Sequence, residues 1–208
     1  MAIVVIGGHS RNIGKTSVVA GLIARLAQHR WTAFKITQYG HGFCTANGEP
    51  CDCQTDDHTL AVSEERSRTS GTDTARFLDS GAQRSIWVRT RQGMLAEAMP
   101  RIHKELAAAE NAIIESNSIL QFLKPDLYLT VLDAGTADFK KSARLFLDRA
   151  DAVLIRATGS GLVPQWDGVS LRLIEGKPQF VIEPPNYMSD DVVGFVEQRM
   201  VKGDFIRM

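Results

Sequence analysis

Residues 3–16 decide the fold of this chain: Ile3-Val4-Val5-Ile6-Gly7-Gly8-His9-Ser10-Arg11-Asn12-Ile13-Gly14-Lys15-Thr16. A short apolar run leads into a loop of small and polar residues that ends in Gly-Lys-Thr, and a helix-like segment follows from Ser17 to Gln28. A strand, such a loop and a helix in this order are typical of the phosphate-binding P-loop. Its backbone N–H groups and the helix N-terminus form a partly positive concavity that favours a polyphosphate.

The residues of this loop have separate expected roles. Lys15 reaches the β- and γ-phosphates, the Thr16 hydroxyl ligates Mg²⁺, and Gly14 lets the backbone approach the phosphates. The usual pattern, G-x-x-x-x-G-K-[ST], begins with glycine where this chain has His9, so the alternative is a chance Gly-Lys-Thr at a helix start. Asn12 tolerates the left-handed conformation that such a loop uses. We predict nucleotide contacts from Gly8, Ser10, Arg11, Asn12, Ile13, Gly14, Lys15, Thr16 and Ser17.

Composition restricts the class of protein. The 208 residues, 44% hydrophobic and 23% charged, suit one soluble domain. No run approaches the ~18 apolar residues of a membrane span, and the start lacks a basic leader, so we expect a cytoplasmic protein without a membrane partner. The net charge of zero argues against a general nucleic-acid binder. No acidic residue precedes Glu49, which suits an anionic ligand for the positively charged first quarter, with Arg11, Lys15, Arg25, Arg30 and Lys35.

Apolar runs and helix-period segments alternate along the chain. Short, unalternating runs indicate strands buried on both faces; we predict them at Ile3–Ile6, Thr32–Ile36, Arg84–Val88, Ala112–Glu115, Leu127–Leu132 and Ala152–Ile155. Helices are predicted at Thr16–His29, Thr74–Asp79, Met94–Ala109, Ile119–Leu123, Phe139–Asp148 and Asp190–Val201. This order predicts an α/β fold of the P-loop NTPase type, a doubly wound and mostly parallel sheet whose ligands bind beyond the carboxyl ends of the strands.

Two segments depart from this alternation. Residues 38–71 form a long loop with three cysteines, in which residues 59–66 could be a short helix. Near the other end, Ser170–Ile174 and Gln179–Ile182 flank a Gly-Lys-Pro turn and predict an antiparallel hairpin. We therefore predict a nucleotide-binding domain over residues 1–160, to which residues 161–208 add a hairpin and a helix.

Three carboxylates are candidate magnesium ligands. Glu115 ends an otherwise apolar strand, and a carboxylate at a strand tip beside a P-loop can bind Mg²⁺; the alternative is an exposed turn residue. Asp133 ends the next strand and competes for this role, although Ala134-Gly135 after it indicates a turn. Asp73 precedes a helix, where an N-cap is the simpler interpretation.

Lysine and cysteine supply two further hypotheses. Lys35 stands in an apolar strand, which is unusual unless its ammonium reaches an anion or, as a strand-edge residue, water. Cys44, Cys51 and Cys53 together with His58 or His41 are the ligand types of a Cys₃His zinc site, although the spacing is not that of a standard zinc finger. The alternative is three unligated cysteines. Three cysteines in a cytoplasmic protein do not indicate a disulfide framework.

With these residues collected, the chain resembles a known family, the MobB-like P-loop proteins of molybdenum-cofactor biosynthesis (molybdopterin-guanine dinucleotide biosynthesis protein B). The resemblance covers about residues 1–135 and lies in Ile3–Thr16, in Thr32-Ala-Phe-Lys-Ile, in Gly71-Thr-Asp-Thr-Ala-Arg-Phe-Leu-Asp-Ser-Gly-Ala and in Ala112-Ile-Ile-Glu-Ser. The P-loop is typical of the whole superfamily, whereas the segment from Gly71 to Ala82 points to this family. Dethiobiotin synthetase, an ATP-using relative, is similar in its lysine after strand two.

The resemblance implies roles and a homodimer. It implies that Thr16, Asp73 and Glu115 surround Mg²⁺, and that Lys15 and Lys35 face phosphates or a substrate anion. Some relatives carry a further lysine early in the loop; Ser10 stands there in this chain, with Arg11 beside it as a substitute cation. Ser116 replaces the family's glycine, and no Asn-Lys-x-Asp motif selects guanine, so GTP and ATP both stay open.

Three functional hypotheses follow from these residues. The first is a Mg²⁺-dependent GTP- or ATP-binding accessory of molybdenum-cofactor enzymes with weak or partner-stimulated hydrolysis, in which Lys15, Lys35 and Arg11 stabilise the transferring phosphate. A second is an ATP-dependent ligase or kinase for a small molecule, resembling dethiobiotin synthetase. A third is a nucleotide-gated metal-binding accessory that uses the Cys44–Cys53 loop.

Overall fold

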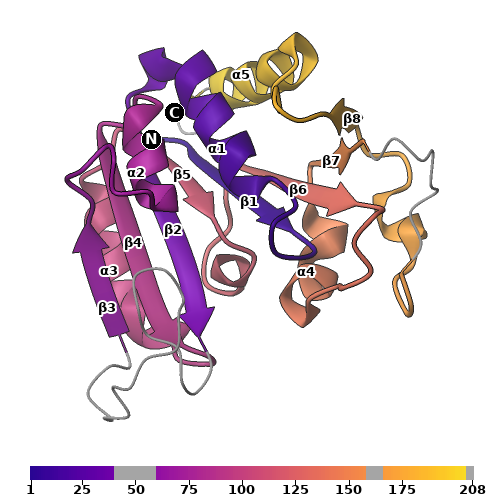
Figure 1. The fold of residues 1–208 in the computed structure, drawn as a ribbon, viewed down its shortest axis with the longest axis horizontal. Helices are drawn as coiled ribbons and strands as arrows, with labels where there is room; N and C mark the ends of the chain where they lie inside the picture. Colours follow the sequence, from indigo (N-terminus) through magenta and orange to yellow (C-terminus); the bar gives the residue numbers. More distant parts are fainter. Residues whose placement is uncertain (40–59, 158–165, 205–208) are drawn as a thin grey trace.

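One sheet runs through a computed structural model of the chain, which describes residues 1–39, 60–157 and 166–204. Eight strands in these residues follow the order β3-β4-β2-β5-β1-β6-β7-β8, and every neighbouring pair is parallel except β3–β4 (Figure 1). This confirms the predicted α/β fold. The strands are β1 (Ile3–Gly8), β2 (Trp31–Tyr39), β3 (Leu60–Glu64), β4 (Arg84–Arg91), β5 (Asn111–Glu115), β6 (Leu127–Asp133), β7 (Ala152–Arg156) and β8 (Gln179–Ile182).

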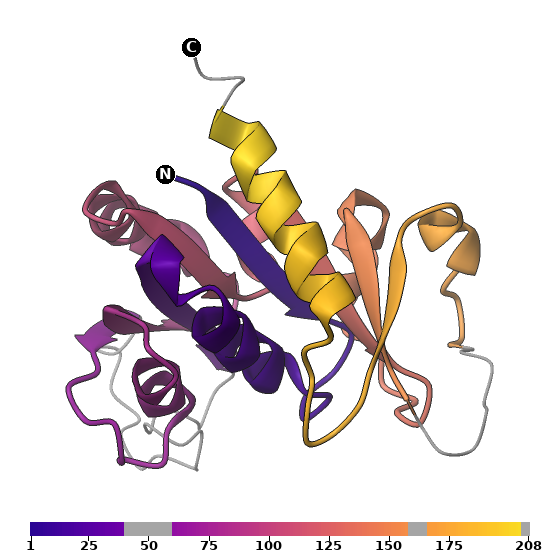
Figure 2. The same ribbon diagram turned by 90° about the horizontal axis from the view of Figure 1, so that it is seen from above.

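Helices cover both faces of this sheet. Seen from above, α1, α2 and α5 lie on one side, and α3 and α4 lie on the other (Figure 2). The α-helices of the described residues are α1 (Lys15–Arg25), α2 (Asp73–Asp79), α3 (Leu95–Ala107), α4 (Lys141–Phe146) and α5 (Asp190–Asp204). Short 3₁₀ turns at Ala27–His29, Ser118–Gln121, Leu147–Arg149 and Leu171–Ile174 complete them. None of the helices in these ranges is both long and apolar enough to cross a membrane.

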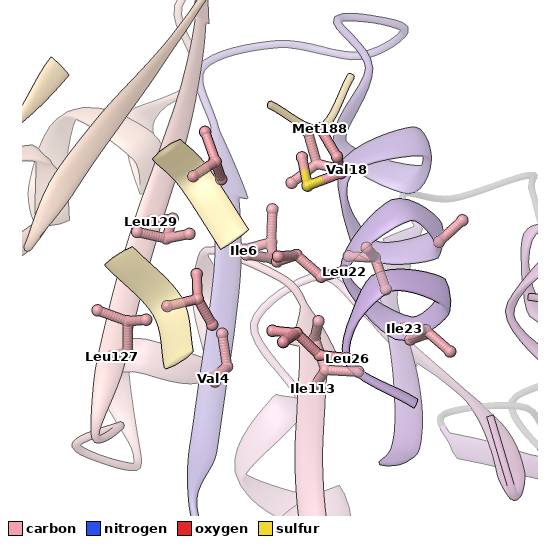
Figure 3. Packing of buried hydrophobic residues seen from close by; sticks show 14 of the residues in the cluster. Val4, Ile6, Val18, Leu22, Ile23, Leu26, Ile113, Leu127, Leu129 and Met188 are labelled. Carbon is pink, nitrogen blue, oxygen red and sulfur yellow. The ribbon is translucent and has the colours of Figure 1, made fainter. Parts of the chain in front are cut away.

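Strand β1 shows why apolar runs without alternation form this sheet. Val4, Val5 and Ile6 are fully buried, but successive side chains point to opposite faces. Val4 and Ile6 join the core under α1 and α5, whereas Val5 joins the core under α3. Figure 3 shows the first of these cores, where Leu22 of α1 packs beside Ile6. Both faces therefore need apolar residues, and the polar side chains are left to the strand ends.

Strand alternation also orients the polar residues of β2 and β5. Lys35 pairs in register with Glu115, which pairs with Ile6 on its other side. Ala33 and Ile113, two residues earlier in each strand, belong to the core under α1. Because alternate residues share a face, Lys35 and Glu115 point to the α1 side at the carboxyl end of the sheet.

Two predictions about irregular segments are wrong. The described part of the predicted segment 59–66 starts at Leu60 and holds no helix; β3 pairs there antiparallel to β4 as an edge strand. The predicted hairpin does not form either, since Leu171–Ile174 is a 3₁₀ turn and β8 pairs parallel to β7. Backbone bonding explains the second correction: the N–H of Val153 donates to Pro178 O and that of Ala157 to Ile182 O, so the open edge of β7 takes up β8.

Candidate functional site

The loop between β1 and α1 adopts the left-handed backbone conformations that a phosphate cradle requires. Asn12 has φ 57° and Gly14 has φ 98°. Gly14 has a second constraint, because a Cβ added there would lie 2.4 Å from Cε1 of Tyr187. Glycine therefore fits this position for two reasons, and the N–H groups at the start of α1 stay accessible to an anion.

His9 replaces the first glycine of the pattern and ties the loop to the end of β6 and the segment after it. Its ring is fully buried, Nδ1 lies 2.7 Å from Asp138 O, and Nε2 accepts the N–H of Asp133 at 3.0 Å. Since a backbone N–H can only donate, Nε2 is the acceptor and the ring proton sits on Nδ1. Burial lowers the pKa of His9, so the neutral ring is favoured. The ring also packs against Phe139 and Trp166, at 5.1 and 4.9 Å between centroids.

Two further residues hold the loop to neighbouring strand ends. Asn117, just after β5, accepts the N–H of Gly8 at 2.9 Å and donates to Gly8 O at 2.8 Å. Ser10, a predicted nucleotide contact, is buried and donates its hydroxyl to Asp138 at 2.8 Å. The N–H of Lys140 donates to His9 O at 2.8 Å. The loop shape is therefore set by residues after β5 and β6 as well as by its own sequence.

The side chain of Lys15 folds back onto its own loop. Its Nζ donates to Ser10 O, and it forms no ion pair with any of the described residues. Burial, the largest cause, lowers the pKa of Lys15 to about 8, although Glu115 partly opposes this. An ammonium that is desolvated without a carboxylate partner favours the approach of an anion, because the anion restores the charged form.

Two more cations lie beside Lys15. Lys140 is half-buried, and its pKa is lowered first by burial and next by the charge of Arg11. Lys140 also acts electrostatically on Lys15, so the three charges surround one loop. Within the described ranges, Arg11 and Lys140 have no ion pair and no side-chain hydrogen bond. Three neighbouring cations that form no ion pair with the described residues favour the approach of a polyanion.

A second cluster, which we call the acid cluster, consists of Thr16, Lys35, Asp73 and Glu115. The Thr16 hydroxyl donates to Glu115 Oε2 at 2.9 Å. Lys35 Nζ lies 2.5 Å from Glu115 Oε1, 2.8 Å from Asp73 Oδ2 and 3.5 Å from Thr16 Oγ1. Burial alone lowers the pKa of Lys35, but Glu115 and Asp73 outweigh it and raise that pKa above its usual value. Four elements, α1, β2, α2 and β5, thus bring Lys35 together with Thr16, Asp73 and Glu115, the residues to which the resemblance gives a magnesium role.

Local geometry decides between the alternatives left by the sequence. Thr72 caps α2, because its side chain accepts the N–H of Ala75 at 3.0 Å, so Asp73 is not the N-cap. Lys35 is not a solvent-facing strand residue, since only 18% of its side chain is exposed. Asp133 is turned away from the acid cluster and pairs with Arg156 at 2.9 Å.

Three solved structures are similar to this chain. HypB from Helicobacter pylori, solved in complex with nickel, is similar over 96% of this chain and 87% of its own, with a TM-score of 0.50 and 15% identity. The fold is that of the P-loop NTPases. LpxK from Aquifex aeolicus, solved with ATP, gives a TM-score of 0.48 at 16% identity over 87% of this chain, which spans 53% of LpxK. MobB from Bacillus subtilis gives 0.43 at 14% identity, over 96% and 98%. No protein-family model and no curated protein matches the chain.

The acid cluster presents oxygen atoms that could hold a hard divalent cation. A hydroxyl and two carboxylates are the oxygen donors that Mg²⁺ prefers, and Mg²⁺ usually completes its shell with water and phosphate oxygens. In the described part of the chain no group of three His, Cys, Asp or Glu side chains could hold a metal by itself. The possible zinc ligands Cys44, Cys51, Cys53 and His58 lie outside the described residues.

Sequence reasoning missed three residues that shape this P-loop. Asn117, Asp138 and Lys140 contact the loop or face it, but none lies in the motif itself. A weak signal existed, because each follows a strand whose carboxyl end meets that of β1. Which atoms they bind became visible only in three dimensions.

Proposed function

We propose that this chain binds a nucleoside triphosphate with Mg²⁺ and hydrolyses it slowly or on stimulation by a partner. The observation that supports this most directly is the set of three cations, Arg11, Lys15 and Lys140, gathered without carboxylate partners around a loop in P-loop conformation. A polyphosphate supplies the missing negative charge.

The site assigns a task to each group in this proposal. The loop N–H groups and Lys15 hold the β- and γ-phosphates, and Arg11 and Lys140 neutralise charge at the outer side. Thr16, Asp73 and Glu115 hold Mg²⁺, directly or through water, and the metal when bound supplies electrostatic stabilisation of the phosphates.

Slow hydrolysis follows from how the carboxylates beside the loop are engaged. Lys35 pairs with both Asp73 and Glu115, and Asp138 accepts the Ser10 hydroxyl. Each of these three carboxylates already has a partner, so we expect catalysis to depend on positioning and charge neutralisation.

The nucleoside has a suitable place next to the loop. A groove of about 310 Å³ starts at Ser17 and runs along α1 towards α2. Tyr187 and Asn186 also line this groove and supply an aromatic ring and an amide. We propose this groove for the base and ribose, and either base is compatible with these groups.

The cellular role is proposed on narrower grounds. An accessory role in molybdenum-cofactor biosynthesis, with a homodimer, rests on the resemblance of Gly71–Ala82 to the MobB-like family. The ligase hypothesis needs Lys35 to hold a substrate anion, whereas Lys35 is paired with Asp73 and Glu115. The nickel in the HypB structure is a property of that protein.

Calorimetric titration with ATP and with GTP, each with and without Mg²⁺, tests the proposal. We expect binding that Mg²⁺ strengthens and that Lys15→Ala weakens by about 100-fold, the loss of a charge-assisted contact to phosphate. Lys124→Ala is the matched control, since Lys124 is exposed and precedes β6 at the opposite end of the strands. Absence of binding by either nucleotide at millimolar concentration overturns the proposal.

A further inference from the structure

The ammonium of Lys35 contacts all three side chains that we assign to the metal. It lies 2.5 Å from an oxygen of Glu115, 2.8 Å from Asp73 and 3.5 Å from the Thr16 hydroxyl. Glu115 is buried, with 3% of its side chain exposed, so its charge depends on a nearby cation. Lys35 supplies this cation in the structure.

We propose that Lys35 is a resident cation that Mg²⁺ replaces, and that this replacement makes the metal and the nucleotide bind cooperatively. The inference rests on the proposed function, because it takes the acid cluster as the magnesium site. It adds a role for Lys35 before any phosphate is bound. In that state the ammonium occupies the carboxylate oxygens, so a metal without nucleotide binds them weakly.

Charge explains why Lys35 and a metal do not share the cluster. Lys35 together with Asp73 and Glu115 carries a net charge of about −1, and adding Mg²⁺ would leave a net positive charge in a largely buried place. The two cations would also compete for the same carboxylate oxygens. Metal binding therefore requires the ammonium to withdraw.

A withdrawn Lys35 needs a new anion. Its backbone is fixed in β2 between β4 and β5, so the side chain alone can turn, and the four-carbon stem permits this. An ammonium left without a partner in this half-buried place is unfavourable. The terminal phosphate on the neighbouring P-loop offers the partner, which is why we expect nucleotide and metal to enter together.

Thermodynamic linkage makes the proposal measurable. If a triphosphate strengthens metal binding, the metal must strengthen triphosphate binding by the same factor. Removing the ammonium removes the competitor, so the metal should bind without nucleotide, and the coupling factor should shrink.

Electron paramagnetic resonance of Mn²⁺ provides the test and does not depend on activity. Free Mn²⁺ is titrated into the wild type, Lys35→Met and Lys35→Arg, each without nucleotide and with a non-hydrolysable triphosphate. We expect Lys35→Met to bind Mn²⁺ alone about tenfold more tightly than the wild type, within the usual range of coupling. Lys35→Arg keeps the charge and should bind it as weakly as the wild type. Lys124→Met, an exposed site, serves as a further control.

Circular dichroism confirms that each variant is folded before its affinity is read. Equal Mn²⁺ affinity of Lys35→Met and the wild type without nucleotide overturns the inference, as does tighter binding by Lys35→Arg than by the wild type. A failure of the proposed function gives a different result: the wild type then binds no triphosphate, either in EDTA or with metal. The Mn²⁺ affinities of Lys35→Met and the wild type without nucleotide can still be compared in that case.

Discussion

The charged side chains on the two sides of the P-loop differ in their ion pairing. On one side, Arg11, Lys15 and Lys140 are cations without carboxylate partners among the described residues. On the other side, Asp73 and Glu115 both pair with Lys35, which offsets one of their two negative charges. The first side thus has no ion-pair partner within the described residues, whereas the second has one. The difference explains why the loop favours a phosphate while Glu115 stays buried beside it.

The largest effect on nucleotide affinity is expected from a change in the backbone of the loop. Gly14→Ala should weaken nucleotide binding by about 100-fold or more, because φ 98° is strained for alanine and the new methyl meets Tyr187. Calorimetry measures the loss. Gly81→Ala is the matched control, since Gly81 has φ 108° but nothing within 4 Å of the added Cβ. Equal affinity of Gly14→Ala and the wild type would contradict the assigned geometry.

The acid side predicts a stability difference between its two carboxylates. Glu115→Gln should lower the free energy of unfolding by about 2–3 kcal/mol, because it leaves Lys35 and Thr16 beside an uncharged group in a buried place. Asp73→Asn should lower it by less than about 1 kcal/mol, since the Asp73 side chain is 46% exposed. Urea denaturation without nucleotide compares them. A larger loss for Asp73→Asn would show that burial does not set the strength of the pair.

The cation side predicts a smaller effect on affinity. Lys140→Ala should raise the Kd for nucleotide by about fivefold, the effect of one partly screened charge. The loss should shrink at high salt because ions screen this attraction. Lys141→Ala should change little, since Lys141 is exposed at the start of α4. If both variants behave alike, Lys140 has no specific place beside the polyphosphate.

Apolar patterning explains why most of the sheet could be predicted from the sequence. The six predicted strands are largely buried, so each appears in the sequence as a short, mostly apolar run, although Lys35 interrupts one and Arg84-Ser85 begins another. β3 and β8 lie at the two edges and are partly exposed, and their patterns fit a helix or a hairpin equally well. Edge pairing is decided by which strand has a free side, and that depends on the assembled sheet.

In the candidate site, too, some features could be predicted from the sequence and others could not. Lys15 and Thr16 are recognisable because their chemistry depends on neighbours in sequence, and Lys35 and Glu115 because a charge ends or interrupts an apolar strand. Their direct pairing could not be predicted, since it requires the register of β2 and β5. His9 stands where the motif has glycine. Its role could not be predicted, because it depends on contacts with Asp133 at the end of β6 and Asp138 in the loop that follows.

The pH dependence of stability tests whether the cation side depends on the buried ring of His9. The folded-state pKa of His9 is lowered by burial, so the unfolded chain binds the proton more tightly. Stability should therefore be full above the unfolded pKa of about 6.5 and fall as the pH drops below it, by at most about 1.4 kcal/mol per pH unit. Glu64 and Glu65 also have lowered pKa values, but their loss begins nearer pH 4.5, so the range from pH 6.5 to 5 isolates the histidine.

Urea denaturation across this range, in the wild type and in His9→Asn, measures that slope. The variant is expected to be less stable at pH 7, because Asp133 and Asp138 lose their imidazole partner, but its stability should vary less with pH. His103→Gln, at an exposed position, should keep the wild-type slope. An unchanged slope in His9→Asn would mean that another group takes up the proton, and the neutral buried ring would then not be what holds the cradle in shape.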